Sequence, residues 1–311
     1  MHIFIVVLRL DKIIQMKKIL LAAFIVMVCA TQINAQETLS PYFKVAEFEA
    51  SISEVSQQVK DALQIDGYDI IGEYNPARDE NLFVICFTNQ ELRGLSLQFN
   101  DRGPLASVMR AGFVKENGKV TLTLLNPEYI FLAYWGEQLN GQEELLSVVS
   151  EKIIGIFKDF GTLENYGGEV KKKDLPGYHY MMMMPYFDDP VELNEFSSFE
   201  QGLEIIRKNL EQKKGGTYKV FEQVFLNKKI AVFGVALWDD ATGEAHFLET
   251  VGKGHIANLP YEIILQDKTA TMLAGKYRIA LYWPELSLGT FMKIKSTPGE
   301  IEDTMKELTA K

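Results

Sequence analysis

The same order of local structural signals occurs twice along this chain, and this repetition constrains the fold more than any other feature of the sequence. A Ser-x-x-Glu pattern opens an amphipathic stretch at Ser51, and a second one opens another at Ser197. In such a capping box the Ser and Glu side chains pair with free amides of the first helical turn. Apolar residues then recur at helical spacing in both stretches. We therefore expect a helix at the start of each half.

Strand signals follow each of these helices. Two runs in each half are rich in β-branched and aromatic residues, a composition typical of strands. A hairpin comes next, and its turn in the first half is the pair Asn117-Gly118, which is typical of two-residue hairpin loops. The expected strands are 68–71, 82–87, 108–114 and 120–125 in the first half and 218–221, 230–235, 261–265 and 269–273 in the second.

Each half then closes in the same way. A short apolar run ends in Tyr134-Trp135 in the first half and in Tyr282-Trp283 in the second. A last helix is expected from the Asn-x-x-Glu pattern at 140–143 and from Thr-Pro-Gly-Glu at 297–300, with Thr as the N-cap and Pro at the first helical position. We interpret the repetition as a tandem duplication; the alternative is two unrelated domains with a similar order of elements.

The fold class that follows is α+β. Adjacent strands joined by short turns imply an antiparallel sheet, and the helices must cover one of its faces. We expect two similar domains related by pseudo-two-fold symmetry. The predicted boundaries are a first repeat domain at 36–160, a linker at 161–191 and a second repeat domain at 192–311.

The first 35 residues have the organisation of a secretory signal peptide. Two lysines after Met16 precede an apolar core at 19–28, and Ala35 ends the segment with a small side chain. We predict that Met16 is the true start, that cleavage follows Ala35, and that the protein is secreted or periplasmic without a stable membrane span. The alternatives are a retained membrane anchor and a lipid anchor at Cys29.

The overall charge excludes some functions. The chain has 32 basic and 42 acidic residues and a formal net charge of −10. An acidic chain is a poor binder of nucleic acid, which requires cationic surface to release counterions, and of anionic lipid surfaces. The sequence lacks a dinucleotide fingerprint, a phosphate-binding loop and the motifs of the large hydrolase classes. We therefore expect no cofactor and no nucleic-acid partner, and we favour a non-catalytic function over an enzymatic one.

Residues 84–92, Val-Ile-Cys-Phe-Thr-Asn-Gln-Glu-Leu, resemble the strand, Cys-Asn-Pro-like turn and short helix of the domain-of-unknown-function family 302. Residues 109–127 resemble the closing hairpin of that family, and Leu259-Pro260 resembles the Leu-Pro that opens it. The resemblance covers most of both halves. It implies an α+β fold in which single domains pair as dimers, so that a fused tandem would form such a pair within one chain. The family has no settled activity.

Aromatic pairs at matching positions, together with the one cysteine that would remain after cleavage, are candidates for a ligand site. Aromatic rings at the end of a strand can line the mouth of a pocket or close the core. A cysteine in an alternating apolar strand is inert when buried, and a reactive one would need a cation such as Arg93 beside it. The candidates are Tyr134, Trp135, Tyr282, Trp283 and Cys86, and we expect the ligand in the cleft between the repeats.

Two further segments could bind a metal. His246, His255 and Glu249 are residue types that hold zinc or other transition metals, although their spacing matches no compact motif. The alternative is that they are surface or hydrogen-bonded side chains. The run Met181 to Met184, within the segment 178–187, could hold soft copper(I). In an extended chain, however, only alternate side chains could converge, and methionine also packs well as a strap or forms an adaptable binding surface.

These features lead to three hypotheses about function. The favoured one is an exported, non-catalytic module that binds a small molecule or a protein partner in the cleft between the repeats. The second is a metal- or thiol-dependent enzyme. The third is a structural or interaction protein of the cell envelope, with residues 181–187 as its adhesive surface. The chain is expected to be a monomer with two pseudo-dimeric repeats or a homo-oligomer.

Overall fold

The computed structural model describes residues 37–311 except residues 140 and 182. The predicted signal peptide at 1–35, with its start at Met16, lies outside the described residues. Thr38–Lys311 forms one compact unit. Within the described part of the chain, no helix combines the length and the apolar character needed to cross a membrane.

An antiparallel sheet of six strands forms the centre of the first half, in the order β3-β4-β5-β6-β2-β7. Asn117 and Gly118 join β5 to β6 and both have positive φ, as the two-residue hairpin turn requires, so this prediction is confirmed. The strands are β2 (Tyr42–Phe48), β3 (Asp69–Tyr74), β4 (Leu82–Thr88), β5 (Met109–Glu116), β6 (Lys119–Leu125) and β7 (Glu164–Tyr166).

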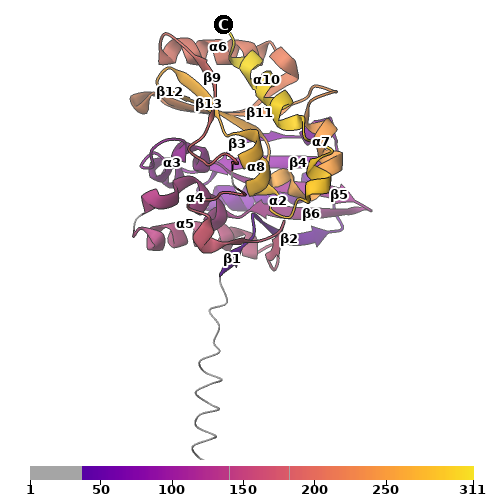
Figure 1. The fold of residues 1–311 in the computed structure, drawn as a ribbon. Coiled ribbons are helices and arrows are strands. Elements are labelled where there is room, and N and C mark those ends of the chain that lie inside the picture. Colours follow the sequence, from indigo (N-terminus) through magenta and orange to yellow (C-terminus); the bar gives the residue numbers. More distant parts are fainter. Residues whose placement is uncertain (1–36, 140, 182) are drawn as a thin grey trace, which may run out of the picture. The chain divides into compact units, whose positions relative to one another are not determined.

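The second half contains an antiparallel sheet of five strands in the order β10-β11-β12-β13-β9. The first strand of each half, β2 or β9, lies beside the last strand of the hairpin, so the five shared strands have the same order in both sheets. Figure 1 shows the two sheets one above the other. The strands are β9 (Val191–Glu195), β10 (Thr217–Phe225), β11 (Ile230–Leu237), β12 (Tyr261–Gln266) and β13 (Thr269–Met272).

Helices connect the strands in a matching order. The predicted amphipathic helices are α2 and α6, which bury their apolar stripes. The helices of the first half are α2 (Ile52–Ile65), α3 (Gln90–Ser96), α4 (Pro127–Trp135) and α5 (Glu143–Lys158). Those of the second are α6 (Phe199–Glu211), α7 (Glu244–Val251), α8 (Gly275–Tyr282), α9 (Leu288–Phe291) and α10 (Thr297–Thr309). The structure thus has the predicted α+β class with antiparallel sheets.

The capping details differ between the two halves. Ser51 caps α2 as predicted, since its hydroxyl accepts a hydrogen bond from the Glu54 amide at 3.1 Å. In the second half the cap is Ser198, one residue later than predicted, and it accepts from the Gln201 amide. The Gln201 side chain in turn accepts from the Ser197 amide at 2.8 Å. Gln201 therefore makes the side-chain contact with a backbone amide that the predicted capping box assigned to Glu200.

The end of each half contains a helix that the sequence pattern did not predict. The apolar run that ends at Trp135 is α4, and the one that ends at Trp283 is α8 with Trp283 directly after it. Asn126 caps α4, its side chain accepting from the Tyr129 amide, and Pro127 begins that helix. The last helix, α10, is preceded by Ser296, so Thr297 is its first residue and not its cap.

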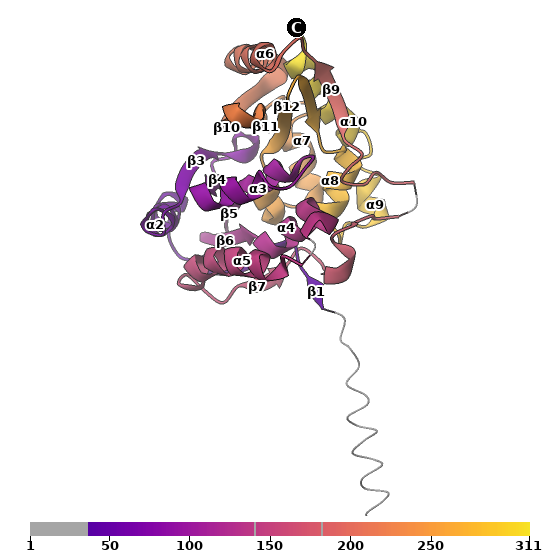
Figure 2. The same cartoon turned by 90° about the vertical axis from the view of Figure 1, so that its left-hand side faces the viewer.

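Short additional elements attach the linker to the first half and the second half to the first. β7, within the predicted linker, pairs with β2, and β8 (Val170–Lys171) pairs with β1 (Thr38–Leu39). The 3-10 segment η7 (Lys253–Asn258) of the second half lies against β5. A Cβ at Gly112 of β5 would lie 2.9 Å from Ile256 Cγ1, so glycine permits this close approach. Figure 2 shows β3 and β10 side by side where the two sheets meet.

Candidate functional site

The two halves meet through a buried ion pair. Arg110 and Glu262 are the second residues of β5 and β12, which hold matching places in the two sheets, and their charged groups are in direct contact. Both side chains are almost fully buried. Burial is the largest single influence and opposes the charged guanidinium, but Glu262 together with Tyr282, Cys86 and Tyr134 raises the pKa of Arg110 above its usual range. Such a pair tolerates burial because each charge is compensated by the other.

Two tyrosines from the ends of α4 and α8 also meet nearby. The hydroxyls of Tyr134 and Tyr282 are hydrogen-bonded at 2.8 Å, and both side chains are buried. Three other tyrosines donate to the last carbonyls of α8, which have no partner within the helix. Tyr178 donates to the Ala280 carbonyl at 2.8 Å, Tyr129 to the Leu281 carbonyl at 2.7 Å, and Tyr42 to the Tyr282 carbonyl at 3.1 Å. The interface where we expected a cleft is therefore occupied by buried, hydrogen-bonded side chains.

Cys86 lies within this interior region. It is fully buried in β4 and is the cross-strand neighbour of Arg110. Burial raises the pKa of the Cys86 thiol to about 12, although Arg110 acts in the opposite direction. Arg93, the cation suggested by the sequence, instead pairs with Asp69 and Gln223. The thiol is therefore protonated and out of reach of solvent at neutral pH.

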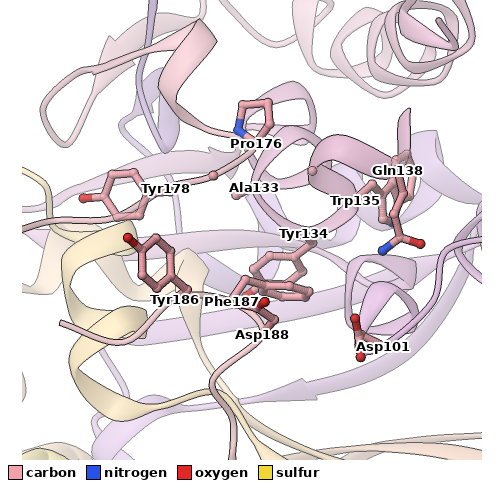
Figure 3. Close-up of a pocket in the computed structure, with 12 residues that line it drawn as sticks. Asp101, Ala133, Tyr134, Trp135, Gln138, Pro176, Tyr178, Tyr186, Phe187 and Asp188 are labelled. Atoms are coloured by element: carbon pink, nitrogen blue, oxygen red, sulfur yellow. The ribbon is translucent and has the colours of Figure 1, made fainter. Parts of the chain in front are cut away.

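A cavity of about 310 Å³ opens beside this interface, between the end of α4 and the linker. We call it the linker cavity. Tyr134 stacks on Phe187 with ring centroids 5.0 Å apart, and Trp135 stacks on Phe131 at 4.3 Å. Figure 3 shows aromatic rings together with the carboxylates of Asp101 and Asp188 around the cavity. Its lining is Asp101, Ala133, Tyr134, Trp135, Gly136, Gln138, Pro176, Gly177, Tyr178, Tyr186, Phe187 and Asp188.

The charges around the linker cavity are mostly negative. Asp101 and Asp188 are exposed and line the cavity. Arg102 is buried beside them, donates to the Phe187 carbonyl at 2.6 Å and lies 5.1 Å from the Phe187 ring centroid. Burial lowers the pKa of Arg102, which Asp101 and Asp188 oppose. The lining thus offers carboxylates and aromatic faces, both of which attract cations.

Trp283 lines a different hollow. This α8 groove has a volume of about 120 Å³ and runs between α8, α9 and the methionine-rich part of the linker. Tyr282, its neighbour, does not line the groove because it faces Tyr134 in the interface. The groove is lined by Tyr180, Met181, Met184, Lys276, Ile279, Ala280, Trp283, Leu286, Leu288 and Phe291.

The structure does not bring the three candidate metal ligands together. His246 and Glu249 are exposed on α7, whereas His255 is buried in η7. His255 Nε2 lies 3.1 Å from Glu285 Oε1, and its ring packs against Tyr42. Burial lowers the pKa of His255, which Glu285 opposes. Among the residues that the structure describes, no group of three or more His, Cys, Asp or Glu side chains is placed to hold a metal ion.

The methionine segment is folded into turns. The Met184 amide donates to the Met181 carbonyl at 3.1 Å, and His179 Nε2 lies 2.7 Å from the Met184 carbonyl oxygen. The His179 ring stacks on Tyr186 at 4.0 Å. Met183 points almost fully into solvent. The extended strand that would align alternate methionines is therefore absent from the described part of this segment.

Sequence reasoning missed the polar lining of the linker cavity. Asp101, Gln138 and Asp188 come from three separate segments, and no spacing pattern connects them. Tyr186 was part of the unusual methionine segment, which is the one signal that pointed to this region. The fold alone brings these residues together.

Comparisons with known proteins give a structural neighbour and no assigned activity. No family model matches the chain, and none of the curated proteins compared with it matches. The crystal structure of an uncharacterized conserved protein DUF302 from Bacillus stearothermophilus is similar, with 8% sequence identity and a TM-score of 0.32. The match covers 39% of this chain and 98% of that one. The neighbour thus comes from the family that residues 84–92 resemble.

Proposed function

We propose that this protein is an exported, non-catalytic binding module that holds a small organic cation in the linker cavity. The observation that carries this proposal is the cavity itself, a hollow of about 310 Å³ with aromatic walls and two carboxylates. Small-molecule sites commonly start at this volume and combine apolar walls with a few polar groups. The proposed site is thus the cavity beside the interface of the two halves, and not the cleft between the repeats that the sequence analysis predicted.

The lining favours a cation over an anion. The ring face of Tyr186 carries partial negative charge, and a protonated amine bound over such a face gains about 0.5–1 kcal/mol at an exposed site. Asp101 and Asp188 add two formal negative charges. The net charge of −10 further raises the local concentration of cations around the molecule.

The state of Cys86 supports the non-catalytic part of the proposal. A thiol-dependent enzyme needs an accessible thiolate, and the Cys86 thiol is buried with a pKa raised to about 12. His246, His255 and Glu249 lie on two different elements, one of the histidines exposed and the other buried. Neither group of residues suggests a reacting centre.

We also propose that the two halves arose by tandem duplication and are related by a pseudo-two-fold axis. The identical order of the five shared strands supports this proposal. So does the contact between Tyr134 and Tyr282, which hold the same place at the ends of α4 and α8, because a residue on a two-fold axis meets its own counterpart.

A binding experiment tests the proposed ligand class. Isothermal titration calorimetry would compare benzylamine, which is cationic, with benzyl alcohol and benzoate. We expect benzylamine to bind most tightly, and the double variant Asp101→Asn/Asp188→Asn to weaken its binding about 5- to 20-fold, since each exposed charge contributes up to about 1 kcal/mol. Asp66→Asn/Asp303→Asn changes two exposed carboxylates elsewhere and serves as the control. Equal affinity for benzylamine and benzyl alcohol would refute the cation site.

Export is tested separately. Intact mass spectrometry of the protein isolated from its source is expected to give a chain that begins at Gln36. A chain that retains residues before Gln36, recovered with the membrane fraction, would contradict cleavage and favour a retained anchor. The same spectrum, recorded under native conditions, would report any small molecule that stays bound.

A further inference from the structure

We propose that the α8 groove is a second, separate binding site, and that its ligand is a free single-chain anionic amphiphile such as an alkyl carboxylate. The alkyl chain would lie in the apolar groove, and the carboxylate would lie at the end formed by Lys276. This site does not depend on the linker cavity, because the two hollows share no lining residue. Figure 2 shows α8 and α9 on the same side of the molecule.

The groove gathers large apolar side chains that are left in contact with water. Leu288 is 70% exposed and Met181 is 54% exposed, and Tyr180 on the same wall is also exposed. Ile279 of α8 and Trp283, the residue directly after α8, lie at the groove with little exposure. Contiguous exposed apolar surface of this kind commonly marks a binding site in a soluble protein. Lys276 is the one charged side chain of the lining.

The walls of the groove are fixed before any ligand arrives. Tyr178 anchors the linker to α8 through its hydrogen bond to the Ala280 carbonyl at 2.8 Å. The turn from Met181 to Met184 is closed by a backbone hydrogen bond and by the contact of His179 with the Met184 carbonyl. A preformed groove loses little conformational entropy on binding, which favours affinity for a small ligand.

The positive charge near Lys276 favours a ligand with an anionic head group. Lys276 also lines an adjoining hollow that contains Lys295 and the first turn of α10. The N-terminus of a helix carries partial positive charge, which adds to that of the lysines. Glu302 faces the same hollow, but its carboxylate is paired with Lys306 at 2.6 Å. Among the described residues, neither Lys276 nor Lys295 has a carboxylate within ion-pair distance.

These charges decide between the possible occupants of the groove. Lys276 in the groove, with Lys295 in the adjoining hollow, and apolar side chains along the rest match a molecule with one anionic end and one alkyl chain. The groove is a hollow of about 120 Å³, below the volume of most small-molecule pockets, so it would take part of a single alkyl chain and leave the rest on the exposed apolar side chains beside it. A bilayer surface fits less well, because the net charge of −10 opposes docking on anionic lipid. A second copy of the chain would bring the same lysines to the interface.

Methionine methyl NMR tests this proposal on the whole protein. With methyl-labelled methionine, titration with octanoate is expected to shift the Met181 and Met184 signals saturably. Lys276→Gln should weaken octanoate binding about three-fold, and Lys228→Gln, an exposed lysine without an ion pair among the described residues, should not. Leu288→Ser should weaken it about five-fold by removing apolar contact. Leu226→Ser is the matched control, since Leu226 is 68% exposed and lies outside the groove.

Several outcomes would overturn the proposal. Octylamine that binds as tightly as octanoate would refute the role of Lys276. Shifts of Met181 and Met184 that depend on protein concentration without any ligand would show that a second copy covers the groove. Sedimentation with vesicles of anionic phospholipid, together with no response to octanoate, would assign the groove to a membrane surface. A failure of benzylamine to bind would leave this site unaffected and would refute only the linker cavity.

Discussion

The ends of α4 and α8 carry the same Tyr-Trp pair, and the linker packs against both, yet the two ends differ in what they offer a ligand. At the end of α4, Tyr134 and Trp135 line a cavity with two carboxylates. At the end of α8, Trp283 lines an apolar groove whose one charged residue is Lys276. A hollow thus lies at each of the two matching helix ends. The segments that differ between the halves determine its charge.

The contrast depends on an interface that holds both helix ends in place. Tyr134 and Tyr282 meet through their hydroxyls, and three more tyrosines bind the end of α8. Because the interface is filled, the two hollows open on its outside.

The largest effect is expected from the buried ion pair. Glu262→Gln leaves the Arg110 charge without its partner and should lower the free energy of unfolding by about 3–5 kcal/mol. The double variant Arg110→Met/Glu262→Met should restore most of that stability, because it removes both charges at similar volume. Urea denaturation measures both. Glu91→Gln is the control, since Glu91 pairs with Lys152 on the surface and should cost less than about 1 kcal/mol.

Equal stability of the Glu262→Gln and Glu91→Gln variants would contradict a rigid interface. The helix ends could then move relative to each other, and the comparison of their hollows would lose its structural basis.

The sequence predicts part of this arrangement for clear physical reasons. α2 and α6 have one buried face, so their periodicity is visible, and Asn117-Gly118 marks its hairpin locally. α4 was missed because eight of its nine residues are buried, which leaves no polar face and hence no helical periodicity. Asn126-Pro127, an N-cap followed by proline, is the signal that could have corrected this.

Other features could not be predicted from local pattern. β2 and β9 pair with the distant strands β6 and β13, and short strands that precede a helix carry little signal of their own. The aromatic candidates were recognised, but their division between interface, cavity and groove depends on which face of α4 and α8 meets the other half. The shifted cap at Ser198 reflects a choice between two adjacent serines that sequence alone leaves open.

A smaller effect is expected on the pH dependence of the free energy of unfolding, to which a buried carboxyl group of the second half contributes. Glu244 of α7 is buried and accepts hydrogen bonds from Tyr74 of the first half and from the Ala77 and Leu237 amides. Burial raises the pKa of Glu244 to about 7, although these hydrogen bonds oppose the shift. The folded state therefore binds this proton more tightly than the unfolded chain. Its stabilising contribution is complete below about pH 4.5 and falls by about 3 kcal/mol as the pH rises through 7.

Glu244→Gln should flatten this dependence, which urea denaturation between pH 4.5 and 8 would measure. The matching helix α3 of the first half buries Leu92, Leu95 and Ser96, with no buried carboxylate. A loss of stability with rising pH that is unchanged in the Glu244→Gln variant would assign the titration to a group other than Glu244. His255 is not that group, because its lowered pKa makes stability fall as the pH falls.

The smallest effect is expected in the linker cavity. Tyr186→Ala removes one aromatic face and should weaken benzylamine binding about two- to five-fold, with stability changed by less than about 0.5 kcal/mol because the side chain is 44% exposed. Tyr218→Ala is the matched control, an aromatic residue that is 38% exposed and lies outside the cavity. Equal losses of affinity in both variants would argue that benzylamine binds without a defined site.

The central claim is that two helix ends with the same aromatic pair carry hollows of opposite charge preference. Calorimetric titration of one ligand in the presence of saturating amounts of the other tests it most directly. The account predicts that benzylamine and octanoate bind together with unchanged affinities, that Asp101→Asn/Asp188→Asn weakens only benzylamine binding, and that Lys276→Gln weakens only octanoate binding. Displacement of one ligand by the other, or a single variant that weakens both, would contradict it.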